Sequence, residues 1–157
     1  MRIVKSDRAT AGFTLVEILI ASAVVGVLLA IAIPAYDRYR ERAKVLQAVG
    51  EIGAMAVAIE TYFVDARTYP DHLGQVGFGT RLDPWGWPYQ YYNLQQKKGN
   101  GGARKDKKLA PLNSDFDLYS LGKDGDSQGP LNAKVSRDDV VRARDGKFIG
   151  LATDFDP

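Results

Sequence analysis

The first third of the chain holds a long apolar segment with one charged residue in it. Residues 13–33 are predominantly apolar, and Glu17 is the only charged side chain among them. A helix of roughly 20 apolar residues spans the hydrocarbon core of a membrane. A carboxylate at that depth costs about 2.5–3.5 kcal/mol or more, so it normally has a partner. The sequence therefore predicts a membrane helix with a functional carboxylate near its start.

A cleavable secretory signal is the alternative interpretation of the same segment, with Ala30-Ile31-Ala32 as its small-residue cleavage site. Two observations favour the membrane helix. Glu17 would be out of place in the apolar region of a signal peptide, and the helical pattern continues beyond Pro34.

A short basic leader precedes the apolar segment and ends at a Gly-Phe junction. Its basic residues are Arg2, Lys5 and Arg8. The run Gly12-Phe13-Thr14-Leu15-Val16-Glu17 resembles the prepilin signature of type IV pilins and type II secretion pseudopilins. The resemblance implies that a prepilin peptidase removes residues 1–12 by cleaving between Gly12 and Phe13, and that the new N-terminus of Phe13 is methylated.

The resemblance also assigns a role in assembly to Glu17, the fifth residue of the expected mature chain. It implies that the Glu17 carboxylate meets the N-terminal amine of Phe13 in a neighbouring subunit. Electrostatics favour this contact, because a carboxylate and an ammonium neutralise each other where the dielectric constant is low. The alternative is a side chain that merely extends to the lipid headgroups.

Gly26 and Pro34 are the two helix-weakening residues in or next to the apolar segment. Proline removes an internal hydrogen bond, and glycine weakens a helix by about 1 kcal/mol relative to alanine. In filaments of the resembled family, the stretch between two such positions can lose helicity. The resemblance therefore implies that Val27–Ile33 can lose helicity in a filament. The alternative is a simple kink at Pro34.

Residues 35–66 carry an apolar stripe with the period of an α-helix. The stripe is formed by Tyr39, Ala43, Leu46, Val49, Ile52, Ala56, Ile59 and Phe63. We expect one helix from Phe13 to about Val64, with residues 13–34 in the membrane and residues 35–66 packed on a domain formed by residues 67–157.

The C-terminal domain is predicted to contain short strands among long loops. Candidate strands are Trp87–Tyr92, Phe116–Leu121 and Lys147–Leu151, in which apolar and polar residues partly alternate. The expected fold class is therefore α+β: a long N-terminal α-helix packed on a small antiparallel sheet, as in pilins. Asp83–Tyr89 and Phe116–Asp124 also resemble segments of the major pseudopilin of type II secretion systems.

A basic, glycine-containing segment, Gln95–Leu109, lies between two of the candidate strands. We interpret it as a flexible and solvated loop. A DNA-uptake pilin could use such a loop on phosphates, but no aromatic residue interleaves with its basic residues. We therefore expect no nucleic-acid partner. Residues 142–157 form a tail beyond the usual end of the resembled family.

Aspartates cluster after the second candidate strand, and hard cations bind clustered carboxylates and carbonyls. The run Asp124-x-Asp126-x-Gln128-Gly129 imitates the start of an EF-hand loop, but Val135 stands where that loop requires a glutamate. The resemblance supplies another geometry, in which a loop of the major pseudopilin binds one calcium ion. Its ligands carry over to the carbonyl of Leu121 and the side chains of Asp124, Asp138 and Asp139. Asp126 is a further candidate ligand, at a position where that family often uses a carbonyl. Aspartates that only stabilise turns are the alternative.

The resemblance implies a structural subunit that polymerises from the inner membrane into the periplasmic pseudopilus of a type II secretion system and pushes exoproteins across the outer membrane. Its implied partners are further copies of itself, minor pseudopilins, the prepilin peptidase and the inner-membrane assembly platform, and its C-terminal domain would lie in the periplasm. The alternative is a subunit of a type IV pilus or DNA-uptake pilus.

An enzyme is not expected from the residue inventory. The chain has no cysteine and a single histidine, His72, which excludes thiol catalysis and zinc sites built on several histidines. It has no glycine-rich phosphate loop or nucleophile motif, and no organic cofactor is expected.

Overall fold

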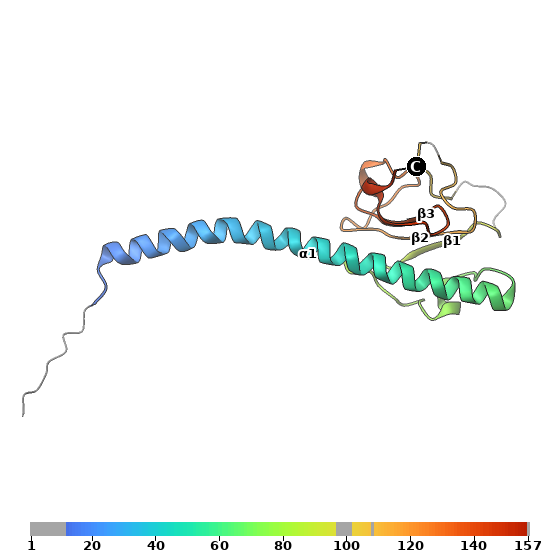
Figure 1. Ribbon diagram of the computed structural model, residues 1–157, viewed down its shortest axis with the longest axis horizontal. Coiled ribbons are helices and arrows are strands. Elements are labelled where there is room, and N and C mark those ends of the chain that lie inside the picture. Colours follow the sequence, from blue (N-terminus) through green and yellow to red (C-terminus); the bar gives the residue numbers. More distant parts are fainter. Residues whose placement is uncertain (1–11, 97–101, 108, 157) are drawn as a thin grey trace, which may run out of the picture. The chain divides into compact units, whose positions relative to one another are not determined.

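The computed structural model describes residues 12–96, 102–107 and 109–156. The predicted leader, up to residue 11, and part of the predicted basic loop lie outside these ranges. Helix α1, Leu15–Ala66, is a single helix of 52 residues that continues through Pro34 (Figure 1). Loss of helicity in Val27–Ile33 on assembly stays a prediction.

The chain divides between Arg40 and Glu41 into two compact units. The first unit contains the apolar part of α1. Within the described residues, α1 is the one helix long and apolar enough to cross a membrane. The large apolar side chains on this part are exposed; among them are Leu15, Val16, Ile18, Leu19, Val24, Val27, Leu28, Ile31 and Ile33, at 53–76%. Such a surface needs lipid or other protein chains to cover it.

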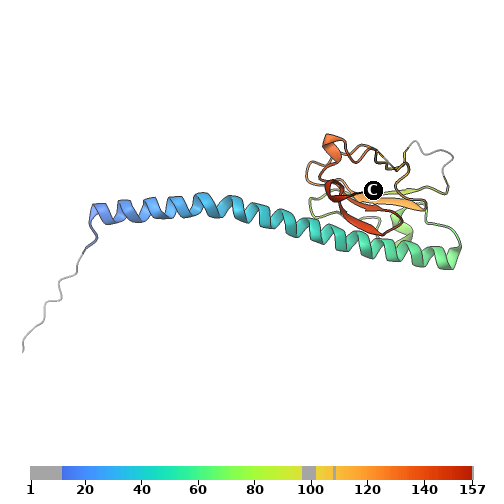
Figure 2. The same cartoon turned by 45° about the horizontal axis from the view of Figure 1, so that its top comes forward.

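The second unit combines the last part of α1 with an antiparallel sheet. The sheet has four strands in the order β1 (Gln90–Asn93), β2 (Phe116–Ser120), β3 (Val140–Ala143) and β4 (Phe148–Leu151). Figures 1 and 2 show the sheet beside the C-terminal part of α1. The predicted α+β layout is therefore confirmed.

The core of this unit lies between α1 and the sheet. Ala48, Ile52, Met55 and Ile59 on α1 are fully buried, and their spacing of four, three and four residues places them on one face of the helix. They share a cluster with Phe116, Leu118 and Val140 of the sheet.

The predicted helical stripe is correct in part. Ile52 and Ile59 are buried as expected, whereas Tyr39 and Leu46 are 71% and 70% exposed. Leu46 lies off the line set by the buried residues, and Tyr39 belongs to the first unit.

Two of the predicted strands match observed ones closely. Phe116–Leu121 contains β2, and Lys147–Leu151 contains β4. Strand β1 begins only at Gln90, because Pro88 forms an isolated bridge with Leu82 instead. Strand β3 was not predicted, and it joins β4 in a hairpin with Ala143 opposite Phe148. The tail therefore completes the sheet.

Candidate functional site

The first candidate site is the N-terminal end of α1. Thr14 precedes the helix, and its Oγ1 accepts a hydrogen bond from the backbone N–H of Glu17 at 3.2 Å. In return, Glu17 Oε2 accepts hydrogen bonds from the backbone N–H and the hydroxyl of Thr14, both at 2.8 Å. This reciprocal pair is a capping box, which satisfies N–H groups that the first helical turn leaves free. Within a single chain, Glu17 therefore caps its own helix.

The other residues predicted for processing and assembly lie along the same segment. Gly12 and Phe13 precede the helix, and the Phe13 side chain is 83% exposed. Gly26 and Pro34 are both inside α1 and exposed. Cleavage, methylation and assembly at these positions stay predictions.

The second candidate site is the loop that follows β2, where calcium was predicted. Leu121 comes directly after β2. Gly122 has φ +66°, and a Cβ atom there would lie 2.4 Å from the carbonyl oxygen of Asp138. Asp138 Oδ2 accepts hydrogen bonds from the backbone N–H groups of Lys123 at 2.8 Å and Asp124 at 3.1 Å. The loop and Asp138 are thus in close contact.

Two of the remaining predicted ligands, Asp124 and Asp139, also have protein donors. Asp124 Oδ1 accepts a hydrogen bond from the backbone N–H of Asp126 at 2.9 Å. Asp139 is fully buried, and its Oδ2 accepts hydrogen bonds from Ser127 Oγ and Arg104 Nη2, each at 2.6 Å. In the described part of the chain, no group of three or more acidic or histidine side chains is placed to hold a metal ion. Calcium binding stays a prediction, and this arrangement does not fit the predicted ligand set.

The aromatic turn before β1 packs against the same region. Asp83 is buried, and its Oδ1 accepts hydrogen bonds from the backbone N–H groups of Trp85 at 3.0 Å and Trp87 at 2.9 Å. Its Oδ2 accepts a hydrogen bond from Ser120 Oγ at 2.6 Å, which connects the turn to β2. A Cβ atom at Gly125 would lie 2.4 Å from the Trp87 ring, so Trp87 rests on the loop.

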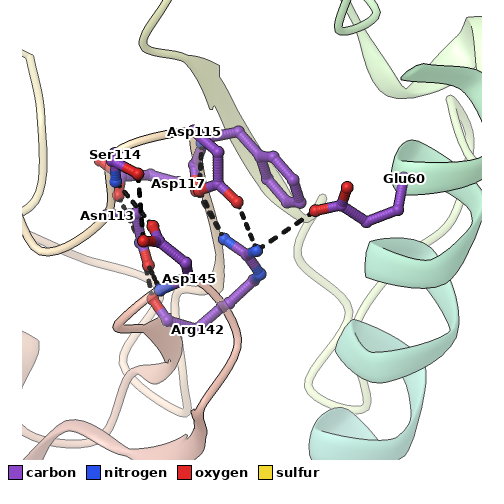
Figure 3. Close-up of polar contacts among 8 residues, drawn as sticks. Glu60, Asn113, Ser114, Asp115, Asp117, Arg142 and Asp145 are labelled. Carbon is purple, nitrogen blue, oxygen red and sulfur yellow. Dashed lines mark hydrogen bonds and ion pairs between the residues drawn. The ribbon is translucent and has the colours of Figure 1, made fainter. Parts of the chain in front are cut away.

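A second buried arginine connects the sheet to α1. Arg142 on β3 is 3% exposed, and its guanidinium donates to Asp115 through Nη1 at 2.8 Å and Nη2 at 2.6 Å. Figure 3 shows Arg142 between this carboxylate and Glu60 of α1, whose Oε1 lies 3.6 Å from Nη2. The guanidinium also lies 4.0 Å from the centroid of the Phe116 ring. Such forked contacts are stronger than single hydrogen bonds between neutral groups.

The loops at this end of the sheet form a connected polar network (Figure 3). Asn113 Nδ2 donates to Asp117 Oδ1 at 2.8 Å and to the carbonyl oxygen of Arg142 at 3.0 Å. Asp145 accepts hydrogen bonds from the N–H and hydroxyl of Ser114 at 2.7 and 3.0 Å. The chain thus fixes its long loops without a disulfide.

Burial changes the acidity of several carboxyls in this network. Desolvation raises the pKa of Glu60, and repulsion from Asp115 adds to that rise, while the charge of Arg142 opposes it. Burial likewise raises the pKa of Asp117, against hydrogen bonds from the Arg104 backbone N–H and from Asn113.

Arg104 and Arg142 are the functional residues that sequence reasoning missed. Arg104 was assigned to a solvated loop, but it is 3% exposed. That part of the prediction is wrong, because the segment around Arg104 packs against the loop between β2 and β3: the Lys105 N–H donates to the Gly129 carbonyl oxygen, and the Leu131 N–H donates to the Lys105 carbonyl oxygen. No local signal pointed to either arginine, because their carboxylate partners, Asp139 for Arg104 and Asp115 for Arg142, lie 35 and 27 positions away.

Together, the capped apolar helix and the small antiparallel sheet define a pilin-like subunit. Residues 7–33 match the family model described as the prokaryotic N-terminal methylation motif. The type II secretion system core protein G of Pseudomonas aeruginosa is 33% identical over 147 residues, which cover 80% of this chain and 92% of that protein. The chain belongs to the family of this core protein G.

Pilins are also similar to the chain. The type IV major fimbrial protein FimA of Dichelobacter nodosus is 45% identical over 60 residues, 38% of each chain. A fimbrial protein of Neisseria meningitidis is 27% identical over 139 residues, covering 85% of this chain and 79% of that protein. Both of these relatives are fimbrial proteins by name. No solved structure matches the chain.

Proposed function

We propose that this chain is a structural subunit that polymerises into the periplasmic pseudopilus of a type II secretion system. The observation that carries the proposal is the extent of the similarity to core protein G, which covers 92% of that protein and so reaches far beyond the shared N-terminal motif. FimA is matched over only 38% of its length, and the fimbrial protein of Neisseria meningitidis is matched over 79% of its length but at the lower identity of 27%. Lengthening of the filament would push exoproteins across the outer membrane.

The exposed apolar part of α1 anchors the subunit before assembly. It crosses the inner membrane once, with the leader in the cytoplasm and the second unit in the periplasm. A prepilin peptidase cleaves between Gly12 and Phe13 and methylates Phe13. Minor pseudopilins and an inner-membrane assembly platform are the further partners, and copies of this chain cover the apolar helix surface in the filament.

Glu17 has two roles in this proposal, and three variants separate them. Within one chain it caps α1, and in the filament its carboxylate neutralises the amine of Phe13 from a neighbouring subunit. Glu17→Gln keeps a capping acceptor but removes the charge, whereas Thr14→Ala removes the two hydrogen bonds of the Thr14 hydroxyl but keeps the charge. Glu17→Ala removes the charge and the acceptor for the Thr14 N–H.

Filament assembly is the readout for these variants, and membrane insertion is the control. We expect Glu17→Gln and Glu17→Ala to insert into the membrane but to form no filaments, and Thr14→Ala to assemble. Normal assembly of Glu17→Gln together with failure of Thr14→Ala would show that Glu17 acts only as a cap.

Deletion of the gene in its own bacterium tests the proposed system. We expect exoproteins to accumulate in the periplasm of the deletion strain, with twitching motility and transformation unchanged, and secretion to return when the gene is restored. Loss of twitching or transformation with normal secretion would instead support the pilus alternative, which the similarity to fimbrial proteins keeps in view.

A further inference from the structure

Arg104 occupies an unusual position for a residue of a basic loop. It is 3% exposed, and its backbone is fixed on both sides. Its N–H donates to Asp117 Oδ2 on β2 at 2.6 Å, and its carbonyl accepts a hydrogen bond from the N–H of Leu112 at 2.9 Å. The side chain therefore starts from a well-defined point beside the sheet.

The Arg104 guanidinium connects four segments of the domain. Nη2 donates to Asp139 Oδ2 at 2.6 Å, and Nη1 donates to the carbonyl oxygen of Gln128 at 2.8 Å and to Ser127 Oγ. Ser127 Oγ in turn donates to Asp139 Oδ2. The guanidinium carbon also lies 4.3 Å from the centroid of the Tyr119 ring on β2. Cation–π contact and charged hydrogen bonds thus act on the same group.

This is the place where the resemblance predicts a divalent cation. A fully buried carboxylate such as Asp139 needs a positive charge close to it, because an unpaired buried charge is strongly unfavourable. Arg104 supplies that charge at Oδ2, whereas Oδ1 of Asp139 is buried without a hydrogen-bond partner among the described residues. Two of the other three predicted carboxylates, Asp124 and Asp138, accept hydrogen bonds from backbone N–H groups of the loop itself.

We propose that Arg104 is the resident cation of the loop between β2 and β3, and that its guanidinium closes the loop in place of a metal ion. The loop is then stable without calcium. The proposal rests on contacts within Glu41–Pro157 and does not depend on which filament the chain builds.

Calcium dependence of the full-length chain in detergent micelles is the first test. The thermal midpoint is measured by circular dichroism after treatment with a chelator and again in millimolar calcium chloride, and calcium binding is measured by isothermal titration. We expect equal midpoints and no binding at one ion per chain. Stoichiometric binding with a rise of several degrees, abolished by Asp124→Ala, would overturn the proposal and establish the predicted calcium site.

Charge-matched variants are the second test. Arg104→Ala removes one member of a buried ion pair, and its thermal midpoint is expected to lie about 6 °C or more below that of the wild type. Lys107→Ala removes one positive charge from the same segment at an exposed position and is expected to leave the midpoint unchanged. Equal midpoints for the two variants would overturn the proposal. If Arg104→Ala does not fold, Arg104→Lys is used, which keeps the charge but has one nitrogen in place of the two that donate to Asp139 and to the Gln128 carbonyl oxygen.

Discussion

The ion pair between Arg142 and Asp115 offers a quantitative test of how this domain is held together. Arg81 and Glu51 form a second ion pair with the same N–O distance, 2.6 Å. The two pairs differ in burial: the side chains are 3% and 10% exposed for Arg142 and Asp115, against 52% and 14% for Arg81 and Glu51. Truncating each arginine to alanine therefore compares burial for two ion pairs with the same closest N–O distance.

The two truncations are expected to lower the free energy of unfolding by amounts that differ by several kcal/mol. Removing one partner of a buried pair costs about 3–5 kcal/mol, because the other charge stays buried without compensation. Arg142→Ala also removes the contact with the Phe116 ring and a hydrogen bond to the Phe116 carbonyl oxygen at 3.1 Å. A pair with an exposed member contributes about 0–1 kcal/mol, and Glu51 keeps hydrogen bonds from Tyr89 and Gln47 after Arg81 is removed.

Urea denaturation of the full-length chain in micelles gives the free energy of unfolding for both variants. The fluorescence of Trp85 and Trp87, the two tryptophans of the chain, reports on the domain. We expect Arg142→Ala to lose about 3–5 kcal/mol and Arg81→Ala no more than about 1 kcal/mol. Equal losses of unfolding free energy would refute the argument that burial decides how much an ion pair contributes to stability. Arg142→Lys replaces Arg142→Ala if the latter does not fold.

Two further predictions concern the same domain. The pKa of Glu60 is raised, so its contribution to stability is present at low pH and is lost as the pH rises through the folded-state pKa. We expect the free-energy difference between wild type and Glu60→Gln in urea titrations to fall as the pH rises above about 4, and a flat difference would contradict this. Gly122→Ala should lower the thermal midpoint more than Gly86→Ala, because both glycines have positive φ but only at Gly122 would the new Cβ meet a neighbouring atom; equal shifts would show that the loop can move aside.

The long helix could be predicted from sequence because two strong signals coincide in it. The apolar length of residues 13–33 and the helical period of residues 35–66 are both independent of the rest of the fold. The cap was visible as well, since Thr14-x-x-Glu17 is a capping-box pattern. The prediction treated Glu17 only as a contact for a neighbouring subunit, and the structure adds its role within the chain.

The buried arginines could not be predicted in the same way. Arg104 stands among lysines and glycines, a composition typical of a solvated loop, and its burial depends on Asp139, which lies 35 positions later in the chain. Strand β3 was missed for a related reason. Arg142 interrupts its short apolar run, and only the partner Asp115 makes an inward-facing arginine acceptable there. Long-range charge pairing decides both cases, and local pattern carries no information about it.

The central claim, that this chain is a processed subunit of a filament, is tested most directly by isolating the assembled protein. The full-length chain is produced together with a prepilin peptidase and a type II secretion assembly platform, and sheared filaments are examined by electron microscopy and mass spectrometry. We predict filaments whose subunit begins at Phe13 and carries one added methyl group on its N-terminus. A chain that remains in the membrane fraction without filaments, or one cleaved after Ala32 as a secretory signal would be, would contradict the account.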